Sequence, residues 1–200
     1  MTAINQSPVV RHIESIPYFA YSDLSDKAKD KAFDKWRNSV EFFSEFIIED
    51  ITNILETIGF YNVKIWYSLG YCQSDFASFN ARYSFKKGSL KELKVNYPHA
   101  TEWHNIAKDL QELQRKNFYS LAGKFTNSDF DIESKNERYW SYDQDNRDLL
   151  KPIIKEINRI IYNSIRAEYE YQTSQECFER WVNDFGIWFT IDGKYFVEGV

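Results

Sequence analysis

Cysteine, glycine and proline are all scarce in this 200-residue chain, which contains 2 Cys, 7 Gly and 4 Pro. Cys72 and Cys177 are far apart and form no Cys-x-x-Cys pair, which argues against a disulfide framework or a zinc site. Low glycine and proline contents argue against a disordered or collagen-like chain. No apolar run approaches the roughly 20 residues of a membrane span, and residues 1–15 lack the plan of a secretory signal. We therefore expect a soluble cytoplasmic protein with no membrane partner.

Aromatic residues, by contrast, are abundant, since 16 Phe, 14 Tyr and 6 Trp make up 18% of the chain. A core of this size needs fewer rings, so we expect some of them to be exposed. The net charge of −5 comes from 30 acidic and 25 basic residues that are mixed along the sequence. Because a phosphate-binding surface usually requires a basic patch, this pattern argues against nucleic acid as the main partner.

Apolar residues recur at helical spacing in several segments. Ser25 is a suitable N-cap for the first helix, Gly59 is placed to end the second, and Pro152 fits the first turn of the longest. Thr173 and Glu176 have the spacing of a capping box that opens a short last helix. The expected helices cover about 25–38, 40–58, 101–116, 148–171 and 173–185.

Alternating apolar and polar residues predict strands between these helices. The polar segment 86–98 and the polar tract that precedes residue 137 are expected to be loops. Asp192-Gly193 favours a type I′ turn that closes a hairpin at the end of the chain. The expected strands cover 63–68, 78–85, 118–126, 137–142, 188–191 and 194–197.

These elements predict an α+β fold in which an antiparallel, meander-type sheet packs against about five helices and ends in a short β-hairpin. No linker or repeat interrupts the sequence. We therefore expect an N-terminal arm over residues 1–20 followed by a single domain over residues 21–200.

Known catalytic patterns are not found in the sequence. It has no phosphate-binding glycine loop, dinucleotide fingerprint or G-x-S-x-G elbow, and no zinc-protease histidine pair. Asp143 to Asp148 lacks the glycine and glutamate of an EF-hand loop, although whether this acidic cluster or that of Asp129, Asp131 and Glu133 binds a cation stays open. We expect no catalytic residue, no metal site and no cofactor. An enzyme with dispersed catalytic residues is the alternative.

The connection between the strands at 63–68 and 78–85 is longer than the common hairpin loop and combines rings with polar side chains. Such a mixture suits a pocket for a planar polar ligand, with Arg82 or Lys64 supplying charge. The alternative is that the rings face the core and the polar groups satisfy the backbone of a turn. The candidate ligand-binding residues are Ser68, Tyr71, Gln73, Ser74, Asp75, Phe76 and Arg82.

The same stretch carries a resemblance, together with the segments 23–32, 56–60 and 168–174. The sequence resembles a family of small bacteriophage and prophage proteins labelled "antitoxin of toxin-antitoxin stability system". Family members typically have serine, glycine and an aromatic residue there, then glutamine-glycine-aspartate-glycine-alanine and a phenylalanine. This chain departs from that pattern at Leu69 and at Ser74 and Phe76, which replace two glycines and would narrow a pocket or alter its specificity. The matching residues are Ser68, Gln73, Asp75, Ala77 and Phe79.

The resemblance implies a non-enzymatic, phage-type antagonist of host defence or of a toxin, acting in the host cytoplasm. It would bind and sequester a nucleotide-like signal or a host toxin or defence protein. A protein partner would be expected to contact an exposed aromatic patch, for instance around Tyr139 and Trp140. A nucleotide-directed hydrolase is the alternative function, and homo-oligomer formation is left open.

Overall fold

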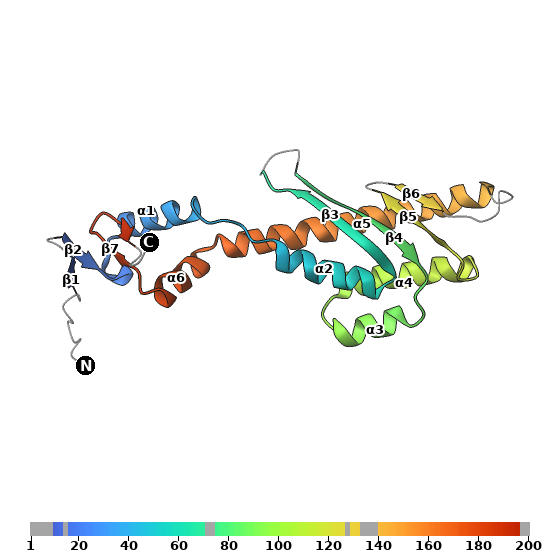
Figure 1. Cartoon of the computed structure of the whole chain (residues 1–200), viewed down its shortest axis with the longest axis horizontal. Helices are drawn as coiled ribbons and strands as arrows, with labels where there is room; N and C mark the ends of the chain where they lie inside the picture. Colours follow the sequence, from blue (N-terminus) through green and yellow to red (C-terminus); the bar gives the residue numbers. More distant parts are fainter. Residues whose placement is uncertain (1–9, 14–15, 71–74, 127–128, 133–139, 197–200) are drawn as a thin grey trace. The chain divides into compact units, whose positions relative to one another are not determined.

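The computed structural model describes residues 10–13, 16–70, 75–126, 129–132 and 140–196. The chain divides into two compact units, of which unit 1 comprises residues 1–42 and 169–200 and unit 2 comprises residues 43–168. Figure 1 labels helices and strands of both units. Each unit contains helices and an antiparallel four-stranded sheet. The predicted α+β fold is therefore confirmed.

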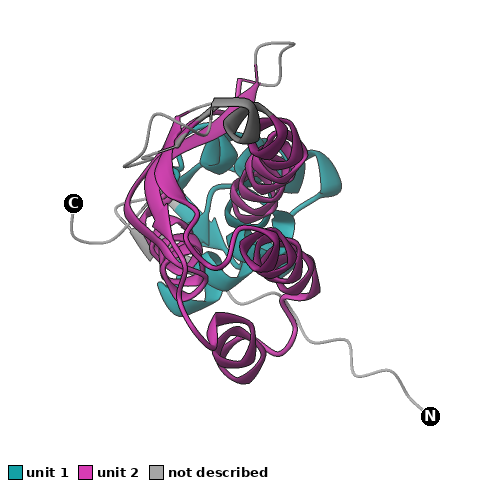
Figure 2. Ribbon diagram, turned by 90° about the vertical axis from the view of Figure 1, so that its right-hand side faces the viewer, with its two compact units in different colours: residues 1–42, 169–200 teal, residues 43–168 magenta. Residues whose placement is uncertain are grey.

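Unit 2 is built on an antiparallel meander in which the strand order β3-β4-β5-β6 follows the sequence. Its helices lie on one side of this sheet (Figure 2). The strands are β3 (Phe60–Ser68), β4 (Phe76–Ser84), β5 (Ala122–Thr126) and β6 (Asp129–Ile132). The helices are α2 (Glu45–Thr57), α3 (Ser89–Asn96), α4 (Thr101–Lys116) and α5 (Trp140–Gln172), within which the unit boundary lies.

Aromatic rings form the sheet side of the unit 2 core. Alternation along β4 buries Phe79, Ala81 and Tyr83. Phe60 and Phe125 complete the cluster, in which ring centroids are 4.9–6.0 Å apart. Full burial of one such ring contributes about 1.5–3 kcal/mol. The helices add buried apolar residues that include Ile51, Leu55, Ile106, Leu110, Ile157 and Ile161.

Unit 1 joins the two ends of the chain through a second sheet, of order β1-β2-β7-β8. Its core surrounds Phe178 of α6, whose ring centroid lies 5.2 Å from those of both Tyr21 and Trp36. As predicted, Ser25 caps α1 by accepting a hydrogen bond from the Ala28 N–H. The elements are β1 (Val10–Ile13), β2 (Ile16–Phe19), the short 3₁₀ helix Tyr21–Asp23, α1 (Asp26–Arg37), α6 (Gln175–Asp184), β7 (Trp188–Phe189) and β8 (Tyr195–Phe196).

The division into units differs from the sequence-based expectation of an arm over 1–20 and one domain over 21–200. Residues 10–13 and 16–19 form strands, and Phe19 of β2 pairs with Phe189 of β7. This pairing joins residues from opposite ends of the chain, and local periodicity carries no information about such pairs. The boundaries of unit 2 fall before α2 and inside α5, where no linker-like composition marks them.

Three predictions in unit 2 are wrong. The segment 86–98 contains α3, which begins after Gly88 at φ +82°. The partner of β5 is β6 within the tract expected to be a loop, whereas residues 140–142 of the expected 137–142 strand begin α5 and residues 137–139 lie outside the described part. Because α5 starts before the expected position, Pro152 lies inside the helix rather than in its first turn. A proline destabilises a helix least in the first turn, where the backbone N–H groups have no carbonyl partner within the helix. Pro152 therefore predicted a later start for α5.

Local turn chemistry also differs at three places. The cap of α6 is Ser174, whose side chain accepts from Cys177 N at 3.2 Å, whereas Thr173 donates to the Tyr169 carbonyl of α5. Of Asp192 and Gly193, only Gly193 has a positive φ, and a type I′ turn needs both. Strand β5 starts at Ala122 rather than 118, because the preceding residues form a turn.

Tyr83 provides a pH-dependent test of the unit 2 core. Burial raises the pKa of Tyr83 to about 12, although a side-chain hydrogen bond with Gln114 acts in the opposite direction. The folded state therefore favours the neutral phenol, and its stabilisation is complete below pH 10 and is lost as the pH rises towards 12. Two pKa units correspond to about 3 kcal/mol. Urea unfolding at pH 9 and pH 11.5, which is still below the folded pKa, should show about 2 kcal/mol of this loss in the wild type and a smaller loss in Tyr83→Phe.

Tyr61→Phe is the matched control, because Tyr61 belongs to the same sheet and is exposed. This variant should lose as much stability as the wild type between the two pH values. An equal loss in Tyr83→Phe and the wild type would show that Tyr83 does not carry the effect.

Candidate ligand-binding surface

The predicted binding loop lies at the tip of the β3–β4 hairpin, and three of its candidate residues, Tyr71, Gln73 and Ser74, fall outside the described residues. Ser68 and Phe76 are opposite each other at the ends of the two strands. The Asp75 carboxylate accepts a hydrogen bond from the Gly70 N–H at 2.7 Å. This bond spans the connection between the strands, so Asp75 has a structural role in the turn.

Arg82 does not lie beside the hairpin tip. Phe76 and Arg82 are on the same face of β4, but Arg82 is six positions after Phe76, which corresponds to about 20 Å along a strand. A small pocket at the tip cannot use both side chains. The sequence-based grouping of Arg82 with Phe76 in a single compact site is therefore corrected to two positions along one face.

That face is the outward side of the unit 2 sheet, and it displays three aromatic rings. Phe76 is 49% exposed, Trp66 45% and Tyr61 39%. In the register of β3 and β4, Trp66 lies opposite Ser78, Lys64 opposite Asn80, and Tyr61 opposite Arg82. Arg82 in turn lies opposite Lys124 of β5. We call this surface the open face and define it by Tyr61, Lys64, Trp66, Phe76, Arg82 and Lys124.

A β-bulge places Tyr61 on the open face. The register shifts between Tyr61 and Lys64, so that two residues of β3 occupy the space opposite one residue of β4. Asn62, inside the bulge, has φ +54°, a left-handed conformation that Asn tolerates better than most residues. Strict alternation would have put Tyr61 and Lys64 on opposite faces. Tyr61 and Trp66 were not among the residues predicted for this site, and the aromatic content, which predicts exposed rings, was the only sign of them in the sequence.

Positive charge predominates on the open face. Strands β3, β4 and β5 contain the cations Lys64, Arg82 and Lys124 and no aspartate or glutamate. Lys64 and Lys124 form no ion pair within the part of the chain that the structure describes. The nearest acid in the register is Asp131 of β6, which lies opposite Lys124 and 3.6 Å from the Arg147 guanidinium. The face therefore presents positive charge beside exposed rings.

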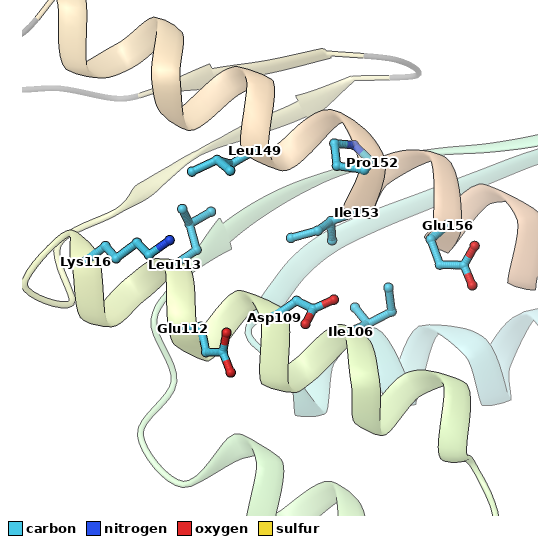
Figure 3. Close-up of a pocket in the computed structure, with 9 residues that line it drawn as sticks. All are labelled: Ile106, Asp109, Glu112, Leu113, Lys116, Leu149, Pro152, Ile153 and Glu156. Atoms are coloured by element: carbon cyan, nitrogen blue, oxygen red, sulfur yellow. The ribbon is translucent and has the colours of Figure 1, made fainter.

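A separate cavity of about 270 Å³ lies between α4 and α5 and has the opposite charge (Figure 3). Apolar side chains such as Leu113 and Ile153 line it together with the carboxylates of Asp109, Glu112 and Glu156 and one cation, Lys116. A hydrogen bond from Arg159 lowers the pKa of Glu156, which keeps that carboxylate ionised. The three carboxylates outnumber the one cation, so the lining has a net negative charge that disfavours phosphate in this cavity.

Metal binding and membrane insertion find no support in the described residues. No group of three or more His, Cys, Asp or Glu side chains among them is arranged to hold a metal ion. His104 of α4 places its Nε2 2.9 Å from the carbonyl oxygen of Tyr97, the residue that follows α3. No helix in the described ranges has both the length and the apolar character needed to cross a membrane. Trp140 lies in α5, and Tyr139 is outside the described residues.

Comparison with known proteins gives one family. No curated protein and no solved structure matches the chain. The family described as "Domain of unknown function (DUF8835)" matches residues 43–175, a range that begins at the first residue of unit 2 and contains the whole sheet with the open face. The chain therefore belongs to this family, and the match covers the unit that carries the candidate surface.

Proposed function

We propose that the chain is a non-enzymatic binding protein that captures a nucleotide-like ligand on the open face of unit 2. The observation that carries this proposal is the combination of exposed rings and acid-free positive charge on β3, β4 and β5. Aromatic rings stack on nucleobases regardless of their identity, while Lys and Arg side chains attract phosphate. An outward-facing sheet surface needs neither exposed rings nor an excess of positive charge for its stability.

Capture without turnover fits the biological role that the resemblance implies. A phage-type antagonist of host defence or of a toxin can work in the host cytoplasm by occupying its target, provided that it is abundant and binds tightly enough. An open, cationic sheet face offers positioning by stacking and charge. A nucleotide-directed hydrolase would require, in addition, an acid, a base or a nucleophile aimed at the bound phosphate.

Trp66 gives the direct test of the surface. Stacking on one aromatic side chain contributes about 1–3 kcal/mol per base. Trp66→Ala should therefore weaken binding of a fluorescent adenine nucleotide by about tenfold, since 1.4 kcal/mol corresponds to a factor of ten. Fluorescence anisotropy at low salt measures the change, and circular dichroism should show an unchanged fold because the ring is exposed.

The matched control is Phe46→Ala, which removes a 79% exposed ring from α2 in the same unit. It should leave nucleotide binding unchanged. An equal loss in both variants, or no loss in Trp66→Ala, would remove the open face from consideration.

The identity of the ligand that is recovered from the protein distinguishes capture from hydrolysis. The protein is incubated with the nucleotide, denatured, and the released small molecules are identified by mass spectrometry. Intact nucleotide in stoichiometric amount supports sequestration. A modified product that accumulates with time, and fails to accumulate with Trp66→Ala, would replace the proposal with the hydrolase alternative.

A further inference from the structure

We infer that the open face binds a single strand of at least two nucleotides, with one base on Trp66 and another on Tyr61. The inference rests on the proposed function and specifies its ligand. It follows from the spacing of the two rings, an observation on which the proposed function does not depend.

The two rings are too far apart for one base. Trp66 and Tyr61 lie opposite Ser78 and Arg82 of β4, positions that are separated by about 13 Å at the rise of a β-strand. Stacked rings have centroids about 4.5–7 Å apart, so a base that stacks closely on one ring, at about 4.5 Å, is about 8.5 Å from the other and outside stacking distance. Two bases of one strand, spread over the sheet, can each have a ring of their own.

The cations have the placement that a connecting backbone requires. Lys64 lies on β3 between the two rings, opposite Asn80. Tyr61, Arg82 and Lys124 then form a row across three neighbouring strands, which are about 4.8 Å apart. A phosphate between the two bases can contact Lys64, and the phosphate beyond the base on Tyr61 can contact Arg82 or Lys124. Antiparallel sheets that bind single-stranded RNA combine aromatic stacking and backbone contacts in this way.

Local charge outweighs net charge for such a ligand. The chain carries −5 in total, which argued against nucleic acid, but electrostatic attraction is screened beyond about 10 Å at 0.1 M salt. Over that distance a strand on the open face meets the three cations Lys64, Arg82 and Lys124. The one acid in their register is Asp131 of β6, which lies opposite Lys124 and is also paired with Arg147. Because this face is exposed, a bound strand can extend past it at both ends, and a longer strand can make more contacts with the protein.

Chain length is the variable to test. Fluorescein-labelled oligouridylates of two, four and eight nucleotides are compared with labelled uridine monophosphate by anisotropy at 50 mM salt. We expect affinity to rise at least tenfold from one nucleotide to four. Tyr61→Ala should weaken binding of the tetranucleotide about tenfold with no effect on the mononucleotide, and Tyr61→Phe should restore it because the ring is kept.

The lysine on the face gives an independent readout. Lys64→Ala should lower the slope of log affinity against log salt by about 0.7, the value expected when one contact to a single strand is lost. Lys94→Ala, which removes an exposed lysine from α3, is the control and should leave the slope unchanged.

Different outcomes overturn the strand inference alone or the proposed function together with it. Equal affinity for one and four nucleotides, still lost in Trp66→Ala, overturns the strand inference and leaves nucleotide capture standing. Tetranucleotide binding that Tyr61→Ala does not weaken likewise overturns the strand inference. Failure of every probe to bind overturns the proposed function and the inference with it.

Discussion

Replacing Gln114 with leucine is expected to lower the free energy of unfolding of unit 2 by about 3–5 kcal/mol. The Gln114 side chain is completely buried in α4. Its Nε2 donates to the Leu121 carbonyl at 2.6 Å, and its Oε1 accepts from the Leu121 N–H at 3.2 Å. It also hydrogen-bonds the Tyr83 side chain. Leucine fills similar space but satisfies none of these groups, and each unsatisfied buried group costs about 1–3 kcal/mol.

The loss should be largest in the turn that leads from α4 to β5. Phe118 and Tyr119 both adopt left-handed conformations there, with φ +51° and +60°. Such conformations persist in non-glycine residues only where surrounding interactions hold them. The two bonds of Gln114 to Leu121 fix the end of this turn. Hydrogen exchange should therefore show early loss of protection at residues 119–125 in Gln114→Leu.

Gln111→Leu is the matched control, because Gln111 is one turn earlier on α4 and only half-buried. Chemical unfolding should find this variant within about 0.5 kcal/mol of the wild type, as is usual for a substitution away from buried polar networks. A Gln114→Leu variant as stable as Gln111→Leu would mean that water or a rearranged backbone satisfies the Leu121 groups.

Helices of unit 2 were predictable where one apolar stripe faces one core. The boundaries of α4 were predicted to the residue, because Trp103, Ile106, Leu110 and Leu113 repeat at helical spacing and all are buried. Helix α3 was missed because Leu93 is its only buried residue, so its sequence has no stripe. In the second sheet the β7–β8 hairpin was predicted, but its pairing with β2 was missed because the partner of β2 is near the other end of the chain. Periodicity describes local burial and carries no information about distant pairing.

The candidate surface was predictable in composition but not in geometry. The aromatic excess predicted exposed rings, and Trp66, Tyr61 and Phe76 are exposed. The position of Tyr61 depends on a bulge, and a bulge changes the facing of every residue that precedes it. Lys124 joins Arg82 only through the pairing of β4 with β5, which the sequence did not specify. Charge averaged over the whole chain concealed the acid-free character of these three strands.

The inner and outer faces of β4 are linked by alternation, so the core fixes the geometry of the open face. Tyr83 is anchored inward, and its neighbour Arg82 must point outward. A variant that loosens the Tyr83 anchor is expected to disturb the row Tyr61, Arg82 and Lys124 as well. Stability and ligand binding should therefore decline together in Gln114→Leu, whereas Trp66→Ala should lose binding alone.

Replacing Gly193 with alanine is expected to destabilise unit 1 by about 4 kcal/mol or more. Gly193 has φ +80°, and a Cβ at this position would overlap the Ala28 carbonyl oxygen of α1 and lie 3.2 Å from the Ala28 Cα. All of these atoms belong to backbone, so no side-chain rotation can relieve the overlap. The turn itself is fixed by the hydrogen bond from the Gly193 N–H to the Thr190 carbonyl at 2.9 Å. The hairpin would have to move away from α1 and open the core around Phe178.

Gly186→Ala separates this steric effect from backbone strain, because Gly186 is also in unit 1 and also left-handed, at φ +61°, but has no heavy atom within 4 Å of the position of a Cβ. It should cost only the left-handed strain of about 1–2 kcal/mol. Hydrogen exchange measured by mass spectrometry should show lost protection in α1 and α6 for Gly193→Ala, little change in them for Gly186→Ala, and unchanged protection in α4 for both. Equal destabilisation by the two variants would show that strain alone, and not the approach of the hairpin to Ala28, makes glycine necessary at residue 193.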